Sequence, residues 1–146
     1  MDSRFLTDRL QFVSVDGFDS PRCRVTSGVP QGSALGPLLF LIYINDLPDL
    51  LSSNCRLFAD DSLLFNYRSN KFILQQDLNV LQLYAAEWQL IFNIPKCAVI
   101  SIGESNSNVD YVLCNTRLSN VNSHSYLGIE LQWNLKWKSH YEKNRE

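Results

Sequence analysis

The spacing of apolar residues along the chain predicts two helices of different character. Between residues 71 and 92 apolar side chains return every three to four positions, which is the spacing of one helix face. They are Leu74, Leu78, Leu81, Tyr84, Ala85 and Trp88. Pro95 is expected to end this helix, because proline breaks the hydrogen-bond ladder and restricts the residue before it. A compact apolar helix is expected over residues 34–44, ending near Asn45-Asp46.

Alternating or β-rich runs predict the strands. Residues 11–15 alternate and are closed by the turn signal Asp16-Gly17. Residues 56–58 and 63–67 read as a hairpin, with Ala59 to Ser62 as its connection. Further short strands are expected at 24–26, 98–102, 111–113 and 126–129, and a last helix at 135–144. Helices and strands mix without strict βαβ alternation, so the predicted fold class is α+β with an antiparallel sheet.

Length and charge narrow the class of protein. The chain has 146 residues, which suits about one domain, with 15 acidic and 13 basic residues and a formal charge of −2. Hydrophobic residues make up 45% and charged residues 19%, which excludes a disordered chain. A strongly basic polyanion-binding module is also excluded. Any attraction to nucleic acid must therefore be local.

Cysteine spacing and hydropathy bear on the compartment. The four cysteines show no CxxC spacing, and we expect them to be buried small hydrophobes in a reducing compartment. They are Cys23, Cys55, Cys97 and Cys114. No secretory signal follows Met1, and the longest apolar run is too short to span a bilayer. We therefore expect an intracellular protein, in the nucleus or cytoplasm, with no membrane partner.

The acidic doublet Asp60-Asp61 carries the sharpest chemical signal. Two carboxylates lie at a predicted hairpin tip between apolar strands. Carboxylates held at a strand end suit a hard divalent cation such as Mg²⁺. Because adjacent strand residues face opposite ways, one aspartate would meet the metal more directly than the other. The alternative is a pair of solvated turn residues, since aspartate favours turns.

A glycine-containing loop gives the second signal. Residues 27–33 contain Gly28, Pro30, Gln31 and Gly32 and lead into the predicted apolar helix. Glycines allow a ligand to approach the backbone closely, and a helix N-terminus offers free N–H groups to a phosphate. Gln31 could hydrogen-bond a sugar, a base edge or a nucleotide backbone. The alternative is a plain connection between loop and helix.

Together these segments resemble a known family. Val25–Phe40, followed by Tyr43–Pro48, closely resembles the reverse transcriptases of non-LTR (LINE-type) retrotransposons. Leu57–Ser62 is similar to the catalytic motif of that family, usually Tyr-Ala-Asp-Asp or Phe-Ala-Asp-Asp. Asn79–Ile102 resembles the following helix and strand, and Tyr126–Ile129 resembles the primer-grip region. The resemblance covers nearly the whole chain in collinear order.

The resemblance implies a partial right-hand polymerase palm, an antiparallel sheet packed on helices. Residues 1–146 would form one partial domain, with residues 120–146 as primer grip and start of the thumb. The implied activity is RNA-directed DNA polymerisation by two Mg²⁺ ions, with Mn²⁺ as an alternative. Asp60 would be a direct metal ligand and Asp61 a more peripheral one. The implied partners are an RNA template, a DNA primer and deoxynucleoside triphosphates.

The resemblance also implies roles for other residues. Pro30, Gln31 and Gly32 would line the nucleotide and template pocket, and Lys96 would lie near the incoming triphosphate. Residues 126–128 (Tyr126, Leu127 and Gly128) would support the primer end. Two plainer interpretations remain open: Lys96 as an exposed strand-edge lysine, and Tyr126 and Leu127 as ordinary core residues.

The family site uses a third aspartate, which the resemblance places upstream of Met1. Asp16 and Asp19 fall in a later turn and do not replace it. We therefore expect the isolated chain not to polymerise, and to act with an upstream polymerase segment in a longer protein.

One alternative is a non-catalytic relic that binds nucleic acid or protein. The residues that would contact a nucleic acid are Lys136, Lys138, Lys143 and Arg145, near Trp133 and Trp137. The plainer interpretation of this basic cluster is a solvated helix face. A metal-dependent hydrolase is disfavoured, because no His cluster accompanies the doublet.

Overall fold

The chain forms two compact units. A computed structural model describes residues 6–67, 70–103, 109–137 and 140–141. The first unit comprises Met1–Asp46 and Leu57–Asp61, and the second comprises Leu47–Arg56 and Ser62–Glu146. Helices and small two-stranded sheets are mixed in the described residues, in agreement with the α+β class predicted from the sequence.

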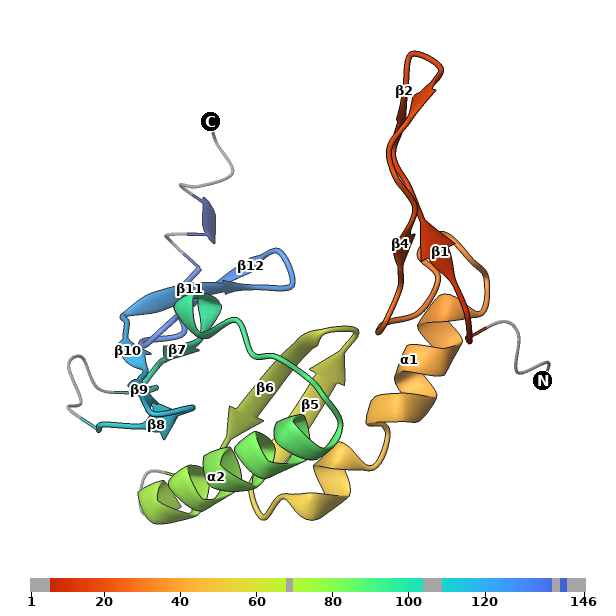
Figure 1. The fold of residues 1–146 in the computed structure, drawn as a ribbon. Coiled ribbons are helices and arrows are strands. Elements are labelled where there is room, and N and C mark those ends of the chain that lie inside the picture. The colour runs from red at the N-terminus through yellow and green to blue at the C-terminus, as the bar shows by residue number, and fades with distance from the viewer. Residues whose placement is uncertain (1–5, 68–69, 104–108, 138–139, 142–146) are drawn as a thin grey trace. The chain divides into compact units, whose positions relative to one another are not determined.

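A long ribbon of short strands opens the first unit (Figure 1). Strand β1 (Leu10–Gln11) pairs antiparallel with β4 (Cys23–Arg24). Further along the ribbon, β2 (Ser14–Val15) pairs antiparallel with β3 (Phe18–Asp19). The single strand expected at 11–15 is therefore two short segments. Its apolar residues do not lie in a core, because every residue from 11 to 20 is exposed.

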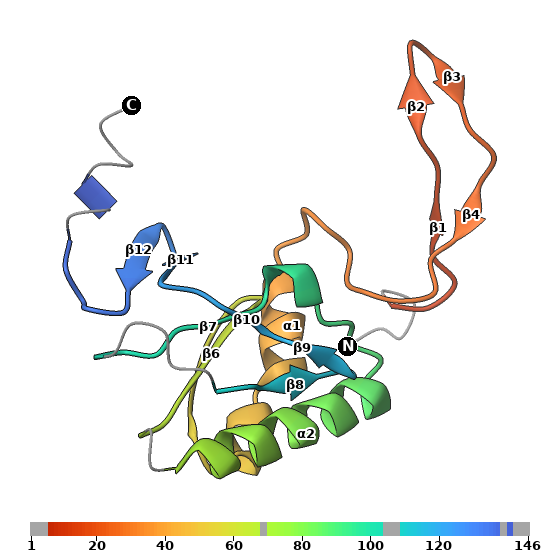
Figure 2. The ribbon, with the colours of Figure 1, turned by 90° about the vertical axis from the view of Figure 1, so that its left-hand side faces the viewer.

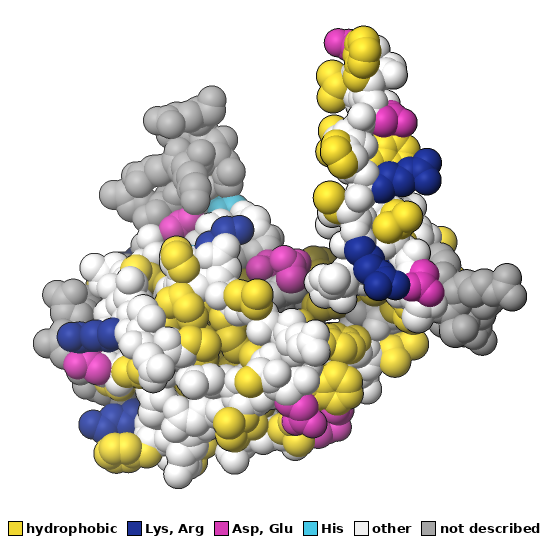
Figure 3. Space-filling model, in the orientation of Figure 1, with side chains coloured by type: hydrophobic (Ala, Val, Ile, Leu, Met, Phe, Trp, Pro, Cys, Tyr) yellow, Lys and Arg dark blue, Asp and Glu magenta, His cyan; other side chains and the backbone are white. Residues whose placement is uncertain are grey.

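Apolar side chains remain on the surface of this ribbon (Figure 3). Phe18 is 82% exposed and Val13 is 66% exposed. The Arg22 guanidinium lies over the Phe12 ring, 5.6 Å from its centroid. An ion pair between Arg24 and Asp8 lies at the surface of the same ribbon. Cross-strand pairs and backbone hydrogen bonds, rather than burial, therefore define this ribbon.

Helix α1 (Gly36–Ile44) ends the first stretch of this unit and begins two residues later than the sequence predicts. Eight of its nine residues are apolar or glycine, and the ninth is Tyr43, so every face of the helix is apolar. Three apolar side chains are more than half exposed: Leu38, Leu41 and Ile42. A helix that is apolar all round lacks the amphipathic stripe of a surface helix.

A hairpin of β5 (Asn54–Phe58) and β6 (Asp61–Phe65) contributes to both units. The predicted four-residue connection is instead a two-residue turn, because Asp61 already belongs to β6. A short 3₁₀ helix, η2 (Leu47–Leu50), precedes the hairpin in the chain. Its Leu47 is only 3% exposed.

Helix α2 (Lys71–Glu87) is the long amphipathic helix that the sequence predicts, but it ends earlier. Gln89 adopts a positive φ of 55°, and the Leu90 N–H donates to the Ala85 carbonyl at 2.8 Å. This is the hydrogen bond of a Schellman C-cap, with Gln89 in the position that glycine usually takes. The expectation that Pro95 ends the helix is therefore wrong. That proline lies in a separate 3₁₀ turn, η4 (Ile94–Lys96).

Glutamine side chains tie α2 to strand β8 (Val112–Leu113), which lies along the helix in Figure 2. The Gln75 amide exchanges two 2.9 Å hydrogen bonds with the backbone of Val112. Gln82 accepts a hydrogen bond from the Cys114 N–H at 3.1 Å. Beneath these contacts lies an apolar cluster centred on three buried residues. Its members are Tyr111, Leu113 and Leu118, packed against Leu74, Leu78, Phe92, Ile94, Cys97, Val99 and Val109.

A buried carboxylate joins α2 to the start of the hairpin. Asp77 is 2% exposed and accepts hydrogen bonds from the backbone N–H groups of Ser52 at 2.9 Å and Ser53 at 2.7 Å. Asn66 extends this network by donating to the Ser53 hydroxyl at 3.1 Å. Buried charge is costly unless it is hydrogen-bonded, and these contacts meet that need. Sequence reasoning did not single out Asp77.

The remaining strands of the second unit form small ladders. Strand β7 (Ala98–Val99) pairs in parallel with β10 (Ser119–Asn120), unlike the antiparallel pairing expected from sequence. Strand β8 pairs antiparallel with β9 (Thr116–Arg117). Strand β11 (Ser123–Tyr126) pairs antiparallel with β12 (Ile129–Gln132), so the strand expected at 126–129 is wrong.

The C-terminal helix expected at 135–144 is only partly described. Leu135 has a positive φ of 54°, which excludes a right-handed helix at that residue. Lys138, Lys143 and Arg145 of the proposed basic cluster lie outside the described residues. Across the part of the chain that the structure describes, every helix is too short or too polar to traverse a bilayer.

The cysteines differ in exposure. Cys55 is buried, Cys97 is half-buried, and Cys23 and Cys114 are exposed. The expectation that all four are buried therefore holds only for Cys55. Burial raises the pKa of the Cys55 thiol, and the Arg56 cation partly opposes this effect. Burial also raises the pKa of the Cys97 thiol, and Cys114 adds to it.

Candidate functional site

The acidic doublet occupies the tip of the β5–β6 hairpin. Ala59 and Asp60 form the turn, and Asp61 is the first residue of β6. Both aspartates are exposed. Their carboxylates are therefore accessible to a ligand from solution, although the two residues lie in different backbone environments.

The turn holds Ala59 in an uncommon conformation. Its φ is +50°, in the left-handed region that favours glycine. Two-residue hairpin turns need such an angle, and alanine adopts it at a cost of about 1–2 kcal/mol. Strained backbone of this kind concentrates at functional sites. The strain lies immediately before Asp60.

Hydrogen bonds shape the glycine-containing loop into a tight corner. The Pro30 carbonyl accepts from the Ser33 N–H at 3.4 Å and from the Ser33 hydroxyl at 2.8 Å. Gly32 has a φ of +77°, as the third residue of a type II turn requires. Gln31 and Gly32, which form the corner, are both exposed.

The same corner packs against the start of α1. The Ser33 hydroxyl oxygen accepts a hydrogen bond of 3.0 Å from the Gly36 N–H. A Cβ atom on Gly36 would lie only 2.9 Å from the Pro30 carbonyl oxygen. Glycine at this position is therefore required for the close approach of helix and loop. The sequence predicts a special loop, and the structure gives the physical reason for the glycine that follows it, Gly36.

The structure brings some of the predicted site residues into one compact unit. Pro30, Gln31 and Gly32 belong to the first unit, as do Asp60 and Asp61. Lys96 and residues 126–128 belong to the second unit.

The predicted residues of the second unit lie in or beside turns, and all but Tyr126 are exposed. Lys96 is exposed at the end of η4 rather than on a strand edge. Tyr126 is half-buried and pairs with Ile129 across the β11–β12 hairpin. Leu127 (φ 49°) and Gly128 (φ 78°) form its turn. Leu127 is 45% exposed, so its side chain is only partly packed.

The doublet has the donor chemistry for a divalent cation. Two exposed carboxylates supply hard oxygen ligands, and Mg²⁺ commonly binds through one or two carboxylates with water and phosphate oxygens completing its shell. Within the described ranges, no three His, Cys, Asp or Glu side chains gather to form a protein-only metal site. The residues present thus fit a partial ligand set that is open to substrate.

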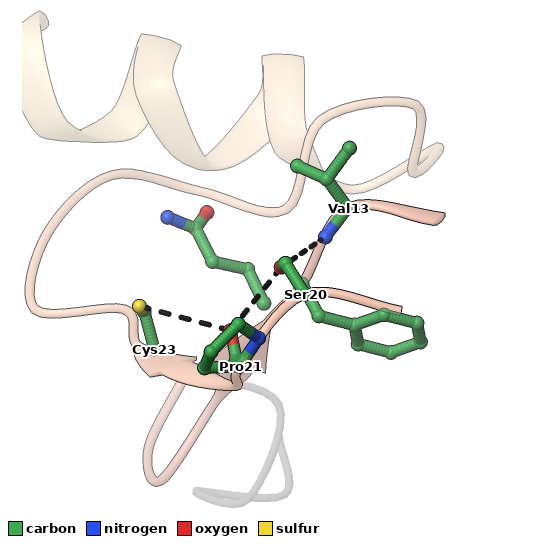
Figure 4. A pocket seen from close by; sticks show the side chains of 6 residues that line it. Val13, Ser20, Pro21 and Cys23 are labelled. Carbon is green, nitrogen blue, oxygen red and sulfur yellow. Dashed lines mark hydrogen bonds between the residues drawn. The ribbon is translucent and has the colours of Figure 1, made fainter. Parts of the chain in front are cut away.

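A small pocket of about 240 Å³ lies in the ribbon of the first unit (Figure 4). The Val13 N–H donates to the Ser20 hydroxyl at 3.0 Å, and that hydroxyl lies 3.2 Å from the Pro21 carbonyl. None of the predicted site residues contributes to this pocket. Its lining consists of Gln11, Phe12, Val13, Ser20, Pro21 and Cys23.

Comparison with known proteins identifies the family. The sequence model of the family "Reverse transcriptase (RNA-dependent DNA polymerase)" matches residues 3–131. The chain therefore belongs to the reverse transcriptase family, whose fold is the polymerase palm. The resemblance to the enzymes of non-LTR elements is confirmed by the relatives described next.

Two relatives are RNA-directed DNA polymerases from the mobile element jockey. The protein from Drosophila melanogaster is 31% identical over 93% of this chain, and the one from Drosophila funebris is 28% identical over 88%. The chain spans about one sixth of the length of these relatives, 16% and 15% respectively. No solved structure matches the chain.

Proposed function

We propose that this chain supplies part of the catalytic centre for RNA-templated DNA synthesis, with Asp60 and Asp61 as the metal-binding carboxylates. The observation that carries the proposal is the exposed doublet at a strained turn, in the same compact unit as the Gln31–Gly32 corner. Both features lie within residues 3–131, the segment that matches the reverse transcriptase family, and this supports the proposal.

The roles of the first unit follow from its chemistry. Asp60 and Asp61 hold divalent cations, which when bound supply Lewis-acid stabilisation of phosphoryl transfer. The exposed corner at Gln31 and Gly32 presents backbone and a side-chain amide to the nucleotide and template. Pro30 fixes the corner through its carbonyl, which accepts both hydrogen bonds from Ser33.

The second unit supplies the other proposed contacts. Lys96 is exposed and offers an ammonium group to a triphosphate. The turn at Leu127 and Gly128, with Tyr126 at the adjoining strand end, supports the primer. In this proposal residues 120–146 are the primer grip and the start of the thumb. The partners of the complete protein are an RNA template, a DNA primer and deoxynucleoside triphosphates.

A chimera tests this function directly. Residues 3–131 replace the matching segment of the Drosophila melanogaster jockey polymerase, and Mg²⁺-dependent extension of a DNA primer on an RNA template is measured. Asp60→Ala should lower extension by roughly three orders of magnitude. Asp49→Asn, a change at an exposed carboxylate of η2, is the matched control and should leave extension unchanged. Undiminished extension by the Asp60→Ala chimera would refute the catalytic assignment.

A second candidate function is binding of nucleic acid without catalysis. Trp137 is 63% exposed and Lys136 beside it is also exposed, which suits stacking and charge contact with a single strand. The test measures binding of single-stranded RNA by the 146-residue chain at several salt concentrations. Tryptophan fluorescence is the readout. Binding that Trp137→Ala weakens, together with a catalytically inert chimera, would favour this function.

A further inference from the structure

Arg9 lies where the ribbon of the first unit leads into the glycine-containing loop. The β1–β4 register sets Leu10 opposite Arg24, and the next residues outward continue the pairing. The Val25 N–H donates to the Arg9 carbonyl at 2.9 Å. The two chain segments are therefore held together up to Val25, two residues before the loop begins.

The side chain of Arg9 continues this contact into the loop. Its Nη2 donates to the Gly28 carbonyl at 2.5 Å, across 19 positions of sequence. Gly28 has a φ of +77°, so its carbonyl is presented by a backbone that most residues avoid. A hydrogen bond from a charged donor is roughly twice as strong as a neutral one. Arg9 thus fixes the first half of the loop.

Arg9 differs from the other arginines of the ribbon. It is half-buried, whereas Arg22 and Arg24 are exposed. Arg24 pairs with Asp8 at the surface, and Arg22 lies over Phe12. The Nε of Arg9 is buried and has no acceptor among the residues that the structure describes. Partial burial of a guanidinium is costly unless it is hydrogen-bonded, and the bond from Nη2 to the Gly28 carbonyl offsets part of that cost.

The loop therefore has two anchors on either side of its exposed corner. Before the corner, Arg9 donates a hydrogen bond to the Gly28 carbonyl. After the corner, the Ser33 hydroxyl donates to the Pro30 carbonyl and accepts from the Gly36 N–H. Only Val29 separates Gly28 from Pro30 in the chain. The position of the Gln31–Gly32 corner thus depends on both anchors.

We propose that Arg9 is a positioning residue that sets the Gln31–Gly32 corner for the incoming deoxynucleoside triphosphate and its template base. The effect on nucleotide use rests on the proposed function, whereas the holding of the loop does not. Arg9 acts through the Gly28 carbonyl and needs no contact with substrate. A small displacement of a positioning group is enough to impair binding of the reacting partner.

Hydrogen exchange of the 146-residue chain tests the holding of the loop. Arg9→Met keeps the apolar stem and removes the donors, and Arg24→Met is the matched control on the paired strand. Amides of residues 28–29 and 31–36 should exchange on the order of tenfold faster in Arg9→Met and at the original rate in Arg24→Met. Arg9→Lys should give an intermediate rate, because lysine lacks the planar fork.

Several outcomes would overturn the inference. One is an unchanged exchange rate of the loop amides in Arg9→Met. Another is exchange that is accelerated equally in Arg24→Met and Arg9→Met. The hydrogen-bonded amides of Ser20 and Leu39, in the same unit as Arg9, report whether that unit is folded in the variant. If Arg9→Met does not fold, Arg9→Lys decides: faster loop exchange than in the original chain supports the inference, and an unchanged rate refutes it.

Steady-state kinetics of the jockey chimera test the consequence for nucleotide use. Arg9→Met should raise the KM for the deoxynucleoside triphosphate about tenfold with a much smaller change in kcat, and Arg24→Met should change neither. An unchanged KM with accelerated loop exchange would refute the nucleotide role alone. Extension that survives Asp60→Ala would instead refute the proposed function, and loop exchange would still decide the role of Arg9 in holding the loop.

Discussion

The buried carboxylate of Asp77 on α2 accepts a 2.7 Å hydrogen bond from the Ser53 N–H, one residue before β5 begins. The same carboxylate accepts a second backbone N–H from Ser52. A helix in the second unit thus fixes the point at which the chain enters the hairpin that carries the acidic doublet. Asp77 is a structural acid, in contrast to the exposed Asp60 and Asp61.

Replacing Asp77 by Asn should destabilise the chain. The amide keeps one acceptor oxygen but places an NH₂ group against a backbone donor, so the free energy of unfolding should fall by about 1–3 kcal/mol. Urea denaturation followed by circular dichroism measures the change. Asp49→Asn, at an exposed carboxylate, should change it by less than about 0.5 kcal/mol. Equal effects of the two substitutions would show that burial of Asp77 contributes nothing.

Gly36→Ala should disturb the loop before α1. The new Cβ would meet the Pro30 carbonyl oxygen at 2.9 Å, so loop or helix must shift. We expect a loss of about 1–3 kcal/mol in stability, although alanine favours helices more than glycine does. Thermal unfolding measures the loss. A gain in stability, as helix propensity alone would give, would contradict the close approach.

The β11–β12 turn offers a separation of stability from function. Leu127→Asn creates an Asn-Gly turn, which suits two consecutive positive φ angles, and should stabilise the hairpin by about 0.5–1 kcal/mol. If Leu127 supports the primer, the same substitution should lower primer extension by the jockey chimera. Gly128→Ala, which strains the turn, is the comparison and should lower stability. Full extension by the Leu127→Asn chimera would remove Leu127 from the primer grip.

Thiol reactivity should follow the exposure of the cysteines. At pH 8, iodoacetamide should modify exposed Cys23 and Cys114 faster than Cys55, because burial shields Cys55 and raises the pKa of its thiol. Peptide mass spectrometry of timed samples gives each rate. Modification of Cys55 at the rate of Cys23 would contradict its burial.

The raised thiol pKa values also predict a pH dependence of stability. A thiol whose pKa is higher in the folded state ionises at a lower pH in the unfolded chain. At pH values between the two pKa values the unfolded state therefore binds fewer protons than the folded state. The contributions of Cys55 and Cys97 are therefore constant at low pH, and stability falls as the pH rises above about 8.5. Denaturation at a series of pH values measures this slope. Cys55→Ala should reduce the slope, and an unchanged slope would exclude Cys55 as a source.

Much of the fold follows from local sequence patterns, and the differences have physical causes. The spacing of Leu74, Leu78 and Leu81 predicted α2 because one face of a helix packs against a core. The early end of α2 could not be predicted, since Gln89 takes a left-handed conformation that its residue type does not favour. Alternation over residues 11–15 predicts one strand with a buried face, but in the ribbon neither face of these residues is buried.

The candidate site divides in the same way. Asp60-Asp61 and the loop at Gln31 are local motifs, so the sequence alone singles them out. Arg9 and Asp77 act on residues 19 and 24 or 25 positions away, and no local pattern marks such pairs. The sequence predicts a strand over 126–129 because the apolar residues that flank Leu127-Gly128 are typical of one, although glycine is a turn signal and both residues have positive φ angles.

The fully exposed ribbon tip has a practical consequence. No side chain between residues 11 and 20 is buried, and the inner β1–β4 ladder closes the ribbon before the loop that Arg9 holds. Additional residues between Asp16 and Gly17 would enlarge a solvent-facing turn without entering any core. This tip is therefore a suitable place for an epitope tag or a surface-immobilisation handle that leaves the acidic doublet accessible.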